Sequence, residues 1–136
     1  MPAYDSQFFS PPAPLAKVTL RNQTNDKTVS DVPMLIDSGA DVTLIPQQLI
    51  TRLGVVIEPD TGYEVMGFDG KKSISQAVSL DMIFLGRSFR GQFLVSNQEW
   101  GIVGRDVLNH LSVLLDGPQL VWDEQISPDS LFKPLR

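Results

Sequence analysis

The chain has 136 residues and a formal net charge of -5, with 42% apolar residues, 20% charged residues, ten glycines and ten prolines. This length fits one globular domain, and the composition is typical of a loop-rich, mostly β protein. The negative charge, without clustered Lys or Arg, disfavours binding to nucleic acid or to an anionic membrane. Because the chain has no Cys, disulfides, thiolate zinc sites and a Cys nucleophile are excluded.

The single histidine, His110, cannot build a typical metal site alone, and no serine motif accompanies it as in a catalytic triad. We interpret it as structural, and we expect neither a metal nor another cofactor. The sequence shows no apolar run of membrane-spanning length and no charged-then-apolar leader. We therefore expect a cytoplasmic protein that binds no membrane.

The first 14 residues are rich in proline around Phe8 and Phe9. Proline has no backbone N–H and favours extended backbone outside central strands, so we expect an unpaired arm over residues 1–14. The arm could be a flexible leader, a strand lent to a partner, or a segment removed by cleavage.

Alternation of polar and apolar residues predicts strands over residues 17–21 and 28–36, with turn residues between them. Residues 47–53 lie between Pro46 and Gly54, which is typical of a short helix. Further along we expect a strand over 89–95, a helical segment over 106–111 and a last strand pair, 113–115 with 120–122. The polar, proline-broken residues 127–136 are expected to form a loose tail.

Asp69-Gly70 is a strong signal for a tight turn and predicts a long hairpin around it. Its returning strand, residues 73–82, places aliphatic residues at most even positions. Ala77, Asp81 and three serines occupy the odd positions. This period of two predicts a strand with one buried face.

The stretch from Leu35 to Ala40 is the most informative in the chain. Two β-formers lead into Asp37, Ser38 and Gly39, and a second apolar segment then runs to Pro46. This pattern predicts strand, tight turn and strand, with a carboxylate that is held by the sheet and open on one side. Taken alone, it also fits an ordinary hairpin, because Asp, Ser and Gly are common turn residues.

Three features occur in the same order here as in one protein family. They are the hydrophobic-Asp-Ser-Gly-Ala turn, the hairpin with a glycine-bearing tip, and a hydrophobic pair that ends in Gly104-Arg105, 67 residues after Asp37. Together they resemble the retropepsin-like aspartic proteases, over about residues 15–123. The resemblance implies an all-β fold: a small closed barrel-like domain with a flap hairpin and one or two short helices, active as a homodimer. The domain would span residues 15–126, between the arm and the tail.

The resemblance also implies roles for individual residues. Asp37 would be catalytic, with the Ser38 hydroxyl bonded across the twofold axis and the Gly39 backbone close to the substrate or the carboxylates. Asp41 would form an ion pair with Arg105, the residue after Gly104, and could also meet the substrate backbone. The remaining substrate-binding positions are Ala40, Val42, Leu44, Trp100 and Ile102, with Gly67, Phe68, Asp69 and Gly70 at the flap tip.

Some of these positions have a simpler explanation. Asp41 and Arg105 would be solvated charges in most proteins, and Leu44 and Ile102 would be ordinary core residues. The flap tip has fewer glycines than viral flaps, and Asp69 is unusual there. For the base of the dimer, residues 120–122 are the candidate strand.

A second Asp-Thr-Gly sequence, at Asp60, competes for the catalytic assignment. It follows Glu58-Pro59 rather than an apolar strand, and no small residue follows its glycine. We interpret it as a loop that leads into the hairpin.

The sequence thus predicts an aspartic endopeptidase that cleaves extended polypeptides with one Asp37 from each of two chains, because two close carboxylates can share a proton and activate water. The alternative is a catalytically weak or inactive retropepsin-like module for peptide binding or dimerisation. A β domain unrelated to proteases is a third possibility.

Overall fold

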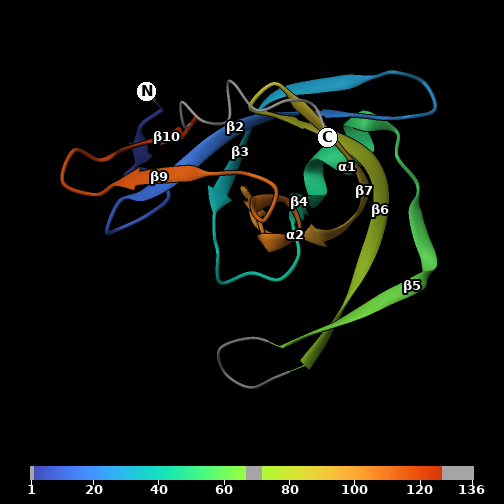
Figure 1. Cartoon of the computed structure of the whole chain (residues 1–136). Coiled ribbons are helices and arrows are strands. Elements are labelled where there is room, and N and C mark those ends of the chain that lie inside the picture. The colour runs from blue at the N-terminus through green and yellow to red at the C-terminus, as the bar shows by residue number, and fades with distance from the viewer. Residues whose placement is uncertain (1, 67–71, 127–136) are drawn as a thin grey trace.

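The computed structural model describes residues 2–66 and 72–126, and for residues 58–66 and 72–75 it describes the backbone alone. Two short helices accompany the strands (Figure 1). The elements in chain order are β1 (Tyr4–Asp5), β2 (Ala13–Arg21), β3 (Thr28–Ile36), β4 (Leu44–Pro46), α1 (Gln47–Leu53), β5 (Ile57–Met66), β6 (Lys72–Phe84), β7 (Arg87–Ser96), β8 (Gly101–Val103), α2 (Arg105–Leu108), β9 (Val113–Asp116) and β10 (Val121–Glu124).

Six strands close into a barrel. Their order is β2, β3, β8, β4, β7 and β6, and β6 pairs back onto β2, from Thr19 opposite Ile83 to Arg21 opposite Asp81. Closure leaves none of these six strands as a free edge along its full length. The expected all-β fold with a small closed barrel, a hairpin extension and short helices is confirmed.

The barrel interior is filled by aliphatic side chains from alternate positions of the strands, as the pleat requires. Its largest fully buried members include Leu20, Met34, Ile45, Leu80 and Met82. Trp122 of β10 joins this core beside Phe84, with ring centroids 6.0 Å apart. A single core of this kind stabilises the strands whose ends carry the functional loops.

Helix α1 has the predicted bounds, and Leu49, Ile50 and Leu53 are its buried residues. The helix ends at Gly54, which has a φ of 70° and donates its N–H to carbonyls of the last turn. Glycine adopts this left-handed conformation without steric cost. Neither α1 nor α2 is long enough to cross a membrane, and the described residues contain no other helix.

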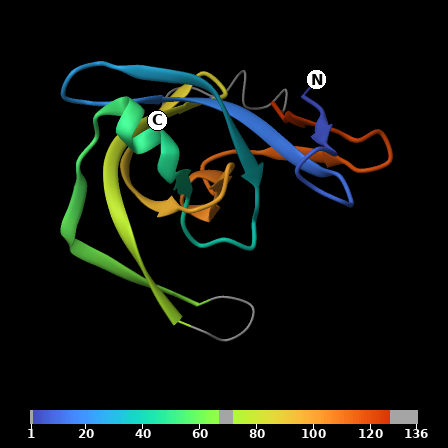
Figure 2. The same ribbon diagram turned by 180° about the vertical axis from the view of Figure 1, so that it is seen from behind.

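The β5–β6 hairpin extends away from the barrel, and the loop at residues 37–43 lies on the same side (Figures 1 and 2). The predicted tip residues Gly67, Phe68, Asp69 and Gly70 lie outside the described residues. Asp60 belongs to β5, so its interpretation as a loop residue is wrong; the pairing of β5 with β6 shifts register between Glu58 and Tyr63.

The N-terminal residues are paired, contrary to the expected unpaired arm. Tyr4 lies opposite Pro14 of β2, and Ala3 forms a bridge with Val121 of β10. The Trp122 N–H donates to the Pro2 carbonyl at 2.9 Å. Short prolyl segments can serve as edge strands because their free carbonyls still accept hydrogen bonds. Strand β2 begins at Ala13, whereas the alternation of polar and apolar residues predicted a start at residue 17.

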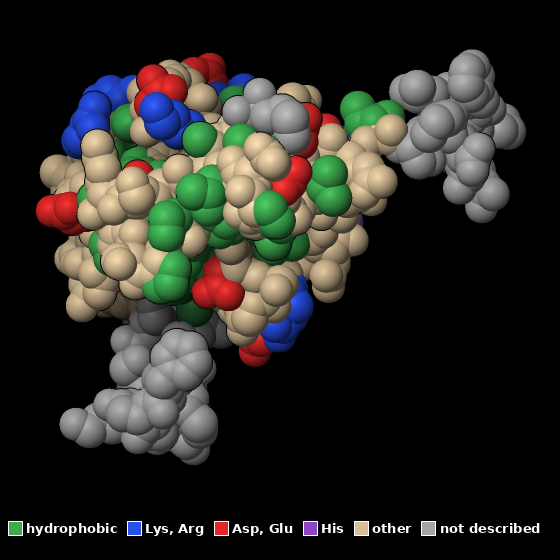
Figure 3. All heavy atoms as spheres, turned by 90° about the vertical axis from the view of Figure 1, so that its left-hand side faces the viewer, with side chains coloured by type: hydrophobic (Ala, Val, Ile, Leu, Met, Phe, Trp, Pro, Cys, Tyr) green, Lys and Arg blue, Asp and Glu red, His purple; other side chains and the backbone are tan. Residues whose placement is uncertain are grey.

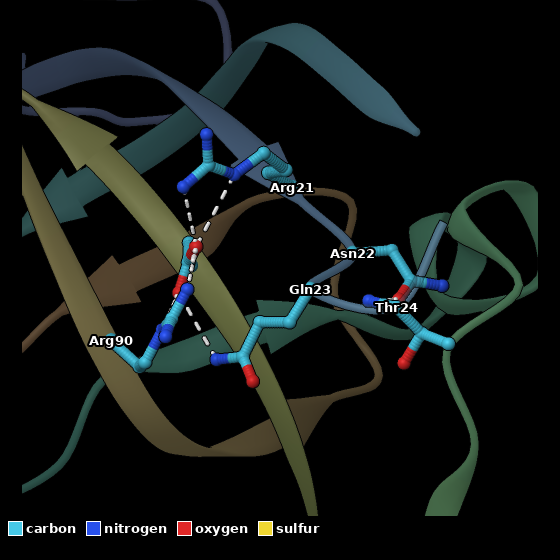
Figure 4. Close-up of polar contacts among 6 residues, drawn as sticks. Arg21, Asn22, Gln23, Thr24 and Arg90 are labelled. Carbon is cyan, nitrogen blue, oxygen red and sulfur yellow. Dashed lines mark hydrogen bonds and ion pairs between the residues drawn. The ribbon is translucent and has the colours of Figure 1, made fainter. Parts of the chain in front are cut away.

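The one-sided burial predicted for residues 73–82 is wrong at Ala77 and Asp81, which are both 0% exposed. Asp81 accepts hydrogen bonds from Arg21 (2.7 Å to Nη2), Arg90 (2.9 Å to Nε) and Gln23 (3.0 Å) (Figure 4). The bond from Arg90 above all, with those from Arg21 and Gln23, outweighs burial and holds the pKa of Asp81 well below its ordinary value. A charged residue is buried here because strands on both sides supply its partners.

Candidate active site

The loop at residues 37–43 leaves β3 at Ile36 and enters β4 at Leu44. The short strand β8 lies between these two strands: it runs parallel to β3 and is bridged in antiparallel fashion to β4 through Ile102 and Leu44. The expected strand-turn-strand is therefore not a hairpin, since β3 and β4 do not pair with each other. The loop crosses the end of β8, which brings Asp37 next to the residues that follow Val103.

Backbone groups hold the partly exposed Asp37 in place. Its N–H donates to the Val103 carbonyl at 3.1 Å, and its own carbonyl accepts from the Ala40 N–H at 3.1 Å. The Gly39 N–H donates to Asp37 Oδ1 at 2.9 Å. A Cβ at Gly39 would lie 3.1 Å from the same oxygen, which is tighter than ordinary contact. The loop thus orients the carboxylate with fixed dipoles, as preorganised catalytic groups require.

Arg105 braces this loop from the start of α2. Its Nη1 donates to the Ser38 carbonyl at 2.7 Å, its Nη2 pairs with Asp41, and its backbone N–H donates to the Ala40 carbonyl at 2.9 Å. Asp41 and Arg105, predicted as an ion pair, are brought together. Because both side chains are exposed, the hydrogen bonds to the loop backbone matter more for its shape than the ion pair.

The segment that contains Ala40 and Val42 passes so close to Gly104 that this position requires glycine. A Cβ at this position would lie 2.7 Å from the carbonyl carbon and oxygen of Val42 and 3.0 Å from the Ala40 carbonyl oxygen. These contacts are with backbone, which cannot rotate away. Only glycine fits without displacement of the loop.

Thr43 connects the same two segments, and sequence reasoning missed it. Its buried hydroxyl donates to Asp106 Oδ1 at 2.7 Å and accepts from the Gly104 N–H at 3.0 Å, while its N–H donates to Asp106 Oδ2 at 3.1 Å. An acidic residue in the first turn of a helix, here Asp106, is a signal that could have drawn attention to it. Thr43 and Asp106 fix the loop relative to α2.

An apolar row extends from the loop across the three strands. Leu35, Ile102 and Leu44 are paired across β3, β8 and β4, so their side chains share one face, and all three are half-buried. Their neighbours Met34, Val103 and Ile45 are buried on the opposite face. The predicted positions Ala40 and Val42 are also half-buried. This row forms an apolar surface, and Asp37 lies at its Leu35 end, two residues further along the chain.

Trp100, two residues before Ile102, is partly covered by the N-terminal segment. The rings of Phe9 and Phe8 lie 4.9 and 5.4 Å from its ring, centroid to centroid. His110 is exposed, lies two residues after the last residue of α2, and takes no part in the contacts of Asp37 described above. Among the side chains that the structure describes, no group of three or more His, Cys, Asp or Glu residues could hold a metal ion.

Comparisons with known proteins gave matches to a family model and to solved structures. Residues 22–110 match a protein-family model described as "gag-polyprotein putative aspartyl protease". A solved structure, EIAV protease complexed with the inhibitor HBY-793, matches with a TM-score of 0.57 and 23% identity, over 72% of this chain and 86% of that chain. No match was found among curated proteins. The structural likeness shows that the two chains share a fold.

Proposed function

Because the chain belongs to the gag-polyprotein aspartyl protease family, we propose that it is an aspartic endopeptidase that works as a homodimer. The observation that carries this proposal is Asp37 itself, partly exposed and held by the N–H groups of its own loop beside an apolar row. Each chain would supply one such carboxylate. The substrate would be an extended polypeptide bound between this surface and the β5–β6 hairpin.

The reaction requires both copies of Asp37. Two carboxylates at about 3 Å cannot both be ionised, so the pair holds one proton. The ionised member takes a proton from a water molecule, which attacks the scissile carbonyl carbon, while the protonated member donates to the carbonyl oxygen. The carboxyl that took the water's proton then donates it to the nitrogen, while the other carboxylate takes back a proton from a hydroxyl of the tetrahedral intermediate; the C–N bond breaks, the amine leaves and the pair again holds one proton. Ser38 would support the partner's loop and Gly39 the carboxylate.

The apolar row fits the substrate role expected for Ala40, Val42, Leu44 and Ile102. These residues are half-buried at the surface beside Asp37, rather than fully buried in the barrel. A peptide strand that alternates its side chains would place every second one against this face.

The test is substitution of Asp37 by Asn, which keeps the shape of the side chain and removes its charge. We expect the rate at which an unfolded protein is cleaved to fall by at least about a thousandfold, because the water loses its base. Mass spectrometry of the products measures this rate. The thermal unfolding midpoint should stay close to that of the wild type. Asp60→Asn is the matched control and should keep its activity.

Two results would overturn the assignment. One is residual activity of Asp37→Asn at the level of the control. The other is a rate that keeps rising from pH 7 to pH 9, because the singly protonated pair is lost in base. If the wild type binds peptides and cleaves none, the chain is instead the non-catalytic peptide-binding module.

A further inference from the structure

We propose that Phe8 and Phe9 of the N-terminal segment are specificity-determining residues, which build an outer substrate subsite for a large apolar or aromatic side chain by fixing the indole of Trp100. The inference rests on the proposed function and adds residues outside the matched range 22–110. Its evidence is a cluster of three aromatic rings. Phe8 and Phe9 lie 6.3 Å apart, and both contact Trp100.

The position of Trp100 places it on the substrate face. The next residue, Gly101, faces the core: a Cβ there would lie 2.3 Å from Met34 Sδ and 2.4 Å from the Leu44 carbonyl oxygen. Trp100 directly precedes β8 and is half-buried, as Ile102 is. Continued alternation of the side chains would place Trp100 on the face opposite Gly101, together with Ile102. The apolar row beside Asp37 therefore continues to Trp100 and ends at the two phenylalanines.

The segment that carries the phenylalanines is fixed at both ends. Before them, Tyr4 pairs with β2 and donates its N–H to the Leu120 carbonyl at 2.8 Å. The Phe8 N–H donates to Asp5 Oδ2 at 2.7 Å, which closes a turn after β1. After them, the chain enters β2 at Ala13. An anchored loop presents the rings, so their contact with Trp100 costs little conformational entropy on substrate binding.

Distance along the strand indicates which substrate residue is recognised. Trp100 precedes Val103, whose carbonyl accepts from Asp37, by three residues, or about 10 Å at the strand rise. An extended substrate has the same rise, so the side chain in contact with the cluster lies about three residues from the cleaved bond. Aromatic and large aliphatic side chains suit it best, because ring edges and faces pack favourably and Phe8 remains 38% exposed.

The first experiment compares peptides that differ only at the third residue on either side of the cleaved bond. The double variant Phe8→Ala/Phe9→Ala should lose about tenfold in kcat/KM for Phe or Leu at that position, mainly through KM, and little for Ala. Phe8→Tyr/Phe9→Tyr should restore the preference. Val56→Ala removes another exposed apolar side chain and should keep the wild-type profile.

Two outcomes would overturn the inference. If kcat/KM of the double alanine variant rises for all peptides alike, the rings cover the cleft as a plug rather than shape a subsite. If the preference at the third residue is unchanged, the rings have no role in specificity.

A second measurement needs no catalysis and separates this inference from the proposed function. The chain has two tryptophans, so 5-fluorotryptophan labelling gives two ¹⁹F resonances, assigned with Trp100→Phe. In the Asp37→Asn variant, a peptide with an aromatic residue at the third position should shift the Trp100 resonance, and the double alanine substitution should abolish that shift. A shift of the same size without Phe8 and Phe9 would contradict the inference, whether or not the wild type cleaves peptides.

Discussion

At the scale of single residues, the candidate site depends on short backbone contacts more than on its ion pair. A Cβ at Gly104 would come closer to the Val42 carbonyl than real side chains do, and a Cβ at Gly39 would crowd the Asp37 carboxylate. Thr43 then joins both segments through a buried hydroxyl. Asp37 is positioned by the sum of these contacts.

Replacement of Thr43 by Val tests the buried hydroxyl. Valine has the same shape but cannot bond to Asp106 or accept the Gly104 N–H, so a buried donor loses its partner. We expect a loss of about 1–3 kcal/mol in the free energy of unfolding, measured by urea denaturation. Thr28→Val, at an exposed position of β3, is the matched control and should change stability by less than about 0.5 kcal/mol. Equal effects of the two substitutions would show that the hydroxyl contributes nothing.

At the scale of elements, the Asp81 cluster joins three strands of the barrel. Asp81 lies on β6, Arg21 on β2 and Arg90 on β7, so one carboxylate spans the seam where the sheet closes. The side chain of Asp81 is fully buried, whereas that of Arg90 is 69% exposed. The arginine side chains therefore stay partly hydrated, while their hydrogen bonds replace the water that the buried carboxylate has lost.

The low pKa of Asp81 predicts how stability depends on acid. An unfolded Asp has a pKa near 3.9, so above about pH 4 the carboxylate is ionised in both states and its full stabilisation is present. As the pH falls below about 4, the unfolded chain binds a proton that the folded chain does not, and the free energy of unfolding decreases. Asp81→Asn should remove this part of the acid slope and cost about 1–3 kcal/mol at pH 7, as seen in urea denaturation across pH.

The exposed Asp26 provides the control for that measurement. Asp26→Asn should keep both the acid slope and the stability at pH 7, and Asn tolerates the φ of 60° found there. If Asp81→Asn keeps the full wild-type slope below pH 4, other carboxylates cause the acid sensitivity.

Local patterns in the sequence predicted most elements and the loop around Asp37. The helix 47–53, the last strand pair and the Asp41–Arg105 contact each follow from short motifs or from the family resemblance. The burial of Asp81 could not be predicted from alternation alone, since it depends on Arg90 of the neighbouring β7 and on Arg21 of β2, which only barrel closure brings next to Asp81. Pairing of Tyr4 was missed for the same reason: its partners lie in β2 and beside β10.

At the scale of the whole molecule, the proposed paired-carboxylate mechanism needs a second chain, and the β9–β10 hairpin offers a surface for it. Leu114, Leu115 and Leu120 are 47%, 51% and 45% exposed. Figure 3 shows hydrophobic side chains gathered on the face that includes this end of the molecule. Trp122 belongs to the strand expected at the dimer base. Its side chain is only 2% exposed and donates its Nε1–H to the Leu15 carbonyl, so it packs within its own chain rather than against a partner.

The leucines of β9 provide the test of association. Burial of such exposed apolar side chains favours a dimer, so Leu114→Ser/Leu115→Ser should weaken it by at least about tenfold in sedimentation experiments. Activity per chain should then fall at low protein concentration and recover at high concentration, because only the dimer holds two copies of Asp37. Val56→Ser changes a 78% exposed residue beyond α1 and should leave both properties as in the wild type. A wild-type chain that is fully active while strictly monomeric would exclude the paired-carboxylate mechanism, whatever the leucine variant does.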